Sequence, residues 1–208
     1  MALAPFSLTQ SEFEPTTRCT AFAGPKCLAT GPLTDVARSV KHAVDSGSTE
    51  EILIFDDETS CLIEVDLRGS EADVLHRLSG AKRDRGDVSV PEKRGPGRPK
   101  LGVVGREVTL LPRHWEWLDG QPGGASVALR RLVETARKSN REQDRRRRAQ
   151  EAVYRFMSTM AGDMPGFEEA LRAFYAGDEQ RLNATVDSWP SGIREHLHKL
   201  VSMTRSGS

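Results

Sequence analysis

The chain has 208 residues, of which 37% are hydrophobic and 29% charged, and its 30 Lys and Arg balance 30 Asp and Glu. This length suits one large domain or two to three small ones, and the charged fraction favours small cores joined by solvated segments. No apolar run approaches the roughly 20 residues of a membrane span, and no signal peptide is evident. Three cysteines without C-x-x-C spacing argue against a disulfide framework. We therefore expect a cytoplasmic protein with no membrane segment.

The net charge of zero hides three blocks of different sign. Residues 1–81 contain 6 Lys/Arg and 13 Asp/Glu, residues 82–148 contain 18 and 9, and residues 149–208 contain 6 and 8. A basic middle between acidic ends is typical of a segment that binds a polyanion. A solvated helix face followed by a linker explains the same charges.

The first part of the chain is predicted to form a disordered N-terminus and a small module. Residues 1–17 are polar and contain two prolines, which is typical of disorder. Residues 18–80 follow the pattern β-β-α-β-β-α, which predicts an antiparallel sheet with helices on one face. Gly24-Pro25 marks the turn of the first hairpin.

The second hairpin of this module turns through three consecutive acids, Asp56 to Glu58. Hard cations bind such oxygens, but the stretch lacks the Gly and the distal Glu of a calcium loop, so we expect solvated turn acids. Cys61, in the following strand, is expected to be a small core residue. Ser70 and Asp73 form a capping-box-like pair at the start of the second helix.

Residues 81–102 are rich in Gly, Pro, Lys and Arg and have no helical or strand period, which predicts a flexible basic linker. Within it, KRGPGRPK at residues 93–100 resembles an AT-hook, an arm that lies in the minor groove of A·T-rich DNA. The core of that motif is Arg-Gly-Arg-Pro, and Pro96 stands where its first arginine would be. A soluble basic linker is the alternative. The residues that the resemblance places against DNA are Lys93, Arg94, Arg98 and Lys100.

Residues 103–140 are predicted to form a short strand followed by two helices. Glu107 to Leu110 alternate with period two, Pro112 suits the start of a short helix, and a Gly-Gly pair precedes the second helix. Apolar residues at helical spacing give the second helix one apolar face.

This order resembles a ribbon-helix-helix domain. The resemblance rests on Val-Thr-Leu in the strand, on the short helix with Leu118, and on GASVALRRLVETA at 124–136. The resemblance implies a homodimer, because such domains pair their strands into a ribbon that enters the major groove of DNA. Glu107 departs from the pattern, since an acid on the DNA-facing side repels phosphate. A helical hairpin packed on the rest of the chain is the alternative. The residues implied to contact DNA here are Arg106, Thr109, Ser126 and Arg130.

Residues 141–203 are predicted to form a C-terminal helical bundle, and residues 204–208 a tail. Helical stripes of Leu, Val, Phe and Met read as core rather than as a cofactor site. His196 and His198 are two apart and face different ways on a helix, so no shared metal is expected. The fold class that the whole pattern predicts is α+β.

Read as a whole, GRPKLGVVGREVTLLPRHWEWLDGQPGGASVALRRLVETAR with the later YRFMSTMAGDMPGFEEALRAF and SWP resembles an uncharacterised bacterial family, over most of residues 18–203. This resemblance carries no activity and no site residues. No P-loop, G-x-G-x-x-G, G-x-S-x-G or H-E-x-x-H motif occurs, so we expect neither an enzyme nor a cofactor. The sequence favours a DNA-binding protein, such as a transcriptional regulator. The alternative is a non-enzymatic protein-interaction or scaffold protein.

Overall fold

The computed structural model describes residues 7–9, 13–80, 104 and 106–205. These residues form an α+β fold that divides into two compact units. Unit 1 takes the described residues of 1–85 and 145–208, and unit 2 takes those of 86–144. Unit 1 is thus built from both ends of the chain, and unit 2 is inserted between them in the sequence.

Unit 1 contains a five-stranded sheet in the order β1-β5-β4-β2-β3. β1 is parallel to β5, and the other neighbours are antiparallel. β1 lies in the segment for which the sequence pattern predicts disorder. The local pattern could not predict this strand, because its partner β5 lies more than 50 residues further along the chain. The strands are β1 (Ser7–Thr9), β2 (Arg18–Ala23), β3 (Lys26–Pro32), β4 (Ile52–Asp56) and β5 (Leu62–Glu64).

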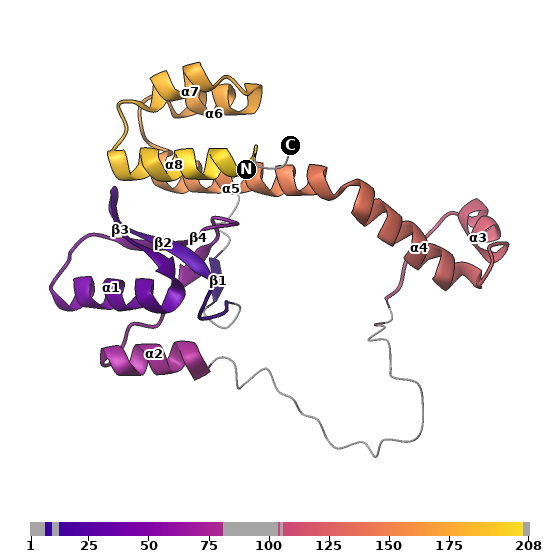
Figure 1. Cartoon of the computed structure of the whole chain (residues 1–208), viewed down its shortest axis with the longest axis horizontal. Coiled ribbons are helices and arrows are strands. Elements are labelled where there is room, and N and C mark those ends of the chain that lie inside the picture. The colour runs from indigo at the N-terminus through magenta and orange to yellow at the C-terminus, as the bar shows by residue number, and fades with distance from the viewer. Residues whose placement is uncertain (1–6, 10–12, 81–103, 105, 206–208) are drawn as a thin grey trace, which may run out of the picture. The chain divides into compact units, whose positions relative to one another are not determined.

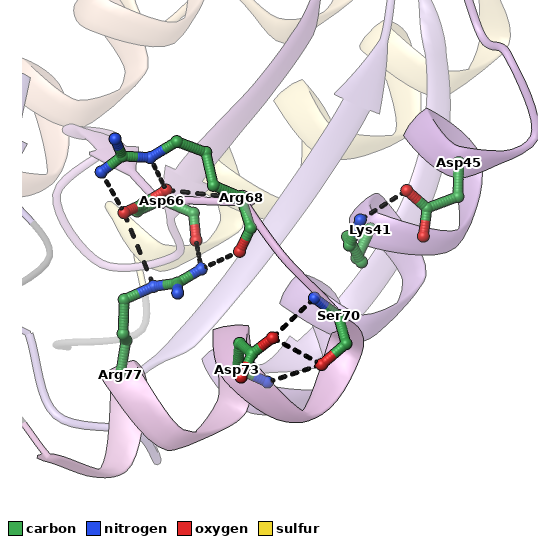
Figure 2. A network of polar contacts seen from close by, with 7 residues as sticks. All are labelled: Lys41, Asp45, Asp66, Arg68, Ser70, Asp73 and Arg77. Carbon is green, nitrogen blue, oxygen red and sulfur yellow. Dashed lines mark hydrogen bonds and ion pairs between the residues drawn. The ribbon is translucent and has the colours of Figure 1, made fainter.

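Two helices complete the N-terminal part of unit 1, α1 (Leu33–Asp45) and α2 (Glu71–Gly80), and the predicted β-β-α-β-β-α order is confirmed. The predicted capping box is also confirmed (Figure 2): the Ser70 amide donates to Asp73 Oδ2 at 2.8 Å, and the Asp73 amide donates to Ser70 Oγ at 3.3 Å. The Ser70 hydroxyl also donates to Asp73 Oδ2, at 2.7 Å, and this hydrogen bond together with that of the Ser70 amide lowers the pKa of the Asp73 carboxyl.

The C-terminal part of unit 1 is helical, as the apolar stripes predict. Asp178 caps the third of its helices by accepting from the Arg181 amide at 3.0 Å. The Trp189 indole is buried and donates to the Pro165 carbonyl at 2.9 Å, which ties two turns of the bundle together. The helices are α5 (Arg141–Ala161), α6 (Phe167–Ala176), α7 (Glu179–Val186) and α8 (Ser191–Met203).

The prediction that the helices of this module cover one face of the sheet is confirmed for α1 and α2, and the C-terminal helices cover the other face (Figure 1). One face packs on α1 and α2, and the other packs on the C-terminal helices. On the second face the ring centroid of Phe156 lies 5.6 Å from that of Phe22 and 5.3 Å from that of Phe55. The two ends of the chain therefore share one hydrophobic core.

The acids of the β4–β5 turn take part in this packing. Asp56 and Asp57 are each only 7% exposed, so the expectation of solvated acids is wrong for both. Asp57 accepts hydrogen bonds from Thr20 Oγ1 and from Lys199 Nζ, each at 2.7 Å. Burial is tolerated because these donors replace the lost water. Asp57 consequently joins β2 and α8.

Candidate nucleic-acid interface

Unit 2 consists of an extended segment and two helices, α3 (Pro112–Asp119) and α4 (Gly124–Ser139), which pack against each other. Pro112 occupies the first turn of α3, where its missing amide hydrogen costs no hydrogen bond. Gly123 and Gly124 both have positive φ angles, 85° and 74°. This left-handed turn favours glycine and sets the angle between the two helices.

The core of unit 2 is very small. Among its described residues, only Leu118 and Ala128 are buried. Of the ten large hydrophobic residues that the described parts of the chain leave exposed, eight lie in unit 2. Two buried side chains make a weak core, so the described part of unit 2 leaves most of its large apolar side chains exposed in the single chain. These eight exposed residues are Val104, Val108, Leu111, Trp115, Trp117, Val127, Leu132 and Val133.

The strand predicted from Glu107 to Leu110 does not form within the single chain. A strand requires a neighbour for its backbone hydrogen bonds, and no described strand of the same chain pairs with this segment. The segment lies before α3 with Val108 and Thr109 exposed. Pairing with a second copy of the segment therefore stays a prediction.

The structure brings together two of the residues predicted to contact DNA. Ser126 and Arg130 lie one turn apart on α4, both are exposed, and Arg130 Nε donates to the Ser126 carbonyl at 3.0 Å. Arg106 and Thr109 are exposed in the segment before α3, and no described contact joins them to the α4 pair. The four predicted arm residues, Lys93, Arg94, Arg98 and Lys100, lie outside the described residues.

Helix α4 presents further basic groups that the prediction did not single out. Arg131 is exposed beside Arg130, while Arg137 and Lys138 occupy the last turn. Cations in this position interact favourably with the negative end of the helix dipole. Arg137 is 74% exposed and pairs with Glu134 at 3.2 Å, an ion pair that water screens.

Both tryptophans of α3 are exposed. Trp115 is 38% exposed and Trp117 is 51% exposed. A signal for this was present, because residues two apart on a helix point about 200° away from each other and cannot share one core. At least one of Trp115 and Trp117 must therefore face away from the rest of unit 2.

The described fold defines an α+β protein in which a helical unit is inserted between the two halves of a sheet-containing unit. The chain belongs to the family described as "Uncharacterized protein conserved in bacteria (DUF2239)", which it matches over residues 18–201. No curated protein and no solved structure matches the chain. None of the helices in the described ranges has the length and apolar character needed to cross a membrane.

Proposed function

We propose that this protein binds DNA through unit 2, with the basic arm that precedes it, and acts as a homodimer. The observation that carries the proposal is the coincidence of two surfaces in one small unit. Exposed arginines lie along α4, and uncovered apolar side chains lie along α3, α4 and the preceding segment. Residues 82–148, which contain unit 2 and extend a few residues beyond it at both ends, hold 18 Lys/Arg against 9 Asp/Glu.

The two surfaces have separate roles. Guanidinium groups such as those of Arg130 and Arg131 attract phosphate oxygens and release condensed counterions, which makes binding strong and dependent on salt. In the arm, Arg98 is the residue of the AT-hook-like motif that would enter a narrow A·T-rich minor groove. The apolar surface would bring two copies together and so double the number of phosphate contacts.

Fluorescence anisotropy with the full-length chain and a labelled duplex tests DNA binding. We expect the affinity to fall at least about tenfold between roughly 50 mM and 200 mM salt. Replacing Arg130 with glutamate should weaken binding and lower the slope of log K against log salt by about 1 or more, because it removes a phosphate contact. Arg172→Glu in α6 is the matched control, since Arg172 is 71% exposed but lies in unit 1. Absence of binding at low salt, or equal losses for both variants, would contradict the proposal.

Sedimentation equilibrium tests the homodimer. We expect a dimer that Val108→Asp dissociates by at least about tenfold in dissociation constant, because a carboxylate cannot be buried against an apolar partner surface. Val108 is 53% exposed in the single chain, so the substitution should leave the fold intact. Val44→Asp is the control, because Val44 is 43% exposed and lies on α1 of unit 1. A parent chain that stays monomeric at high concentration would exclude self-association.

The second candidate function is that of a non-enzymatic protein-interaction or scaffold protein. The exposed Trp115 and Trp117 favour it, because tryptophan is enriched among the residues that dominate protein interfaces. The anisotropy experiment separates the two candidates. A scaffold would show no salt-dependent DNA binding, while it would lose its partner on Trp117→Ala.

A further inference from the structure

Helix α4 has an apolar stripe that α3 covers over only part of its length. The stripe consists of Ala, Leu and Val side chains at helical spacing. Where α3 packs on α4, Ala128 is buried and Leu129 is half-buried. One turn further on, Leu132 is 45% exposed and Val133 is 57% exposed, and α4 extends beyond α3 (Figure 1). The second half of the stripe is therefore uncovered in the single chain.

The uncovered half of the stripe has an arginine on each side. With about 100° between successive residues, Arg131 lies on the side of Leu132, and Arg137 lies one turn after Val133 on the other side. Both arginines are exposed. Arg137 pairs with Glu134 at 3.2 Å, but 74% of the Arg137 side chain is exposed, so water screens this pair. Both guanidinium groups are therefore accessible to acidic side chains of a partner.

The charges beside the stripe select its occupant. Residues 130–138 contain four Lys/Arg and one Asp/Glu, so a second copy of α4 would bring like charges together, which lowers affinity. The homodimer proposed above is tested through Val108, in the segment before α3, and does not require this part of α4. Helices that lie on a membrane surface bury a long apolar face rich in Trp, Phe and Leu, whereas this stripe is two turns long. An acidic helix with an apolar face of its own complements the stripe in both respects.

We propose that the second half of α4 is a docking surface for an acidic amphipathic helix of another protein. Apolar side chains of that helix cover Leu132 and Val133, and its carboxylates pair with Arg131 and Arg137. The complex is weak and transient, because the surface is small, and the opposite charges act mainly on the rate of association. Leu132 points about 200° away from Arg130, so the partner leaves the candidate DNA contact of Arg130 accessible.

Fluorescence anisotropy of the full-length chain with two labelled peptides tests this surface. Both peptides have roughly 20 residues, leucines at the positions of one helix face, and a side-chain staple that keeps them helical. One peptide has glutamate and the other has lysine at the charged positions. We expect the glutamate peptide to bind saturably and the lysine peptide to bind at least about tenfold more weakly. Equal binding of the two peptides, or no saturable binding of the glutamate peptide, would overturn the proposal.

Leu132→Gln locates the peptide on the stripe. The substitution keeps the charge of α4 but places a polar amide against the apolar side of the peptide, so the glutamate peptide should bind at least about tenfold more weakly. Val127→Gln is the matched control, because Val127 is also 45% exposed on α4 but lies outside the stripe, about 60° from Arg130. Circular dichroism checks that both variants keep the helicity of the parent. Unchanged affinity in Leu132→Gln, or equal losses in the two variants, would refute docking on the stripe.

Three further measurements on Leu132→Gln separate the partner helix from other occupants of the stripe. We expect its sedimentation, its affinity for duplex DNA and its retention on phosphatidylglycerol vesicles to equal those of the parent. A dimer that dissociates as strongly as in Val108→Asp would assign the stripe to a second copy. Weaker duplex binding would assign it to DNA, and lower retention on vesicles would assign it to a membrane surface. Each of these three results would overturn the proposal, and none depends on the outcome for Arg130→Glu.

Discussion

Phe156→Ala is expected to lower the free energy of unfolding of unit 1 by about 4 kcal/mol. The Phe156 ring is fully buried between the sheet and the C-terminal helices, and it contacts the rings of Phe22, Phe55 and His196. Truncation removes the transfer free energy of the ring and leaves a cavity that surrounding side chains from both ends of the chain cannot fill. Urea unfolding followed by far-ultraviolet circular dichroism measures the loss.

Tyr175→Ala is the matched control for this prediction. Tyr175 also lies on a C-terminal helix, but 54% of it is exposed, so its loss should cost less than about 1 kcal/mol. Because both ends of the chain share the core, amide hydrogen exchange in β4 and in α8 should accelerate together in Phe156→Ala. Acceleration confined to the C-terminal helices would show that the two ends fold separately.

Acidification is expected to destabilise unit 1 through His196. His196 is 6% exposed, and its ring packs edge-on against Phe22 and tilted against Phe156 with centroid separations of 5.5 and 4.6 Å. Burial, and to a smaller extent the nearby Lys199, lower the pKa of His196 from 6.5 to about 4, while Asp57 opposes the change. The folded state therefore binds fewer protons than the unfolded state between pH 6.5 and 4. This contribution to the free energy of unfolding is fully present above pH 6.5. It decreases as the pH is lowered, by about 3 kcal/mol at pH 4.

The measurement is the free energy of unfolding at several pH values, compared between the parent and His196→Phe. The substitution keeps a ring against Phe22 and Phe156 but removes the proton site. We expect the variant to gain about 3 kcal/mol relative to the parent when the pH falls from 7 to 4. His198→Phe, on the exposed side of the same helix, should follow the parent. A parent and His196→Phe with the same pH dependence would refute the role of His196.

The parts of the fold that can be predicted from the sequence are those that depend on residues close to each other along the chain. Turn glycines, alternating strands and helical stripes identify the β-β-α-β-β-α order, and the Ser70–Asp73 box joins residues only three positions apart. The coverage of both sheet faces had a weaker signal. In β2 the run Cys19 to Phe22 contains no charged residue, and a run without regular polar alternation is typical of a strand covered on both sides; all four residues are buried in the structure.

Features that depend on distant residues could not be predicted in the same way. Asp57 is separated from Thr20 by 37 residues and from Lys199 by 142, and no local pattern records such a pairing. At the candidate DNA interface, sequence correctly places Ser126 and Arg130 on one helix, but pairing of the 106–111 segment requires a second chain.

The insertion of unit 2 between the two parts of unit 1 also sets the order in which the protein can fold during synthesis. The ribosome makes β2 and β4 long before α5 and α8, so Phe22 and Phe55 lack their covering helices while more than 90 residues are added. At roughly 5–20 residues per second this interval lasts several seconds. During that time one apolar face of the nascent sheet remains exposed, where chaperones can bind it or other chains can aggregate on it. The core of unit 1 can be completed only after α8 has left the exit tunnel.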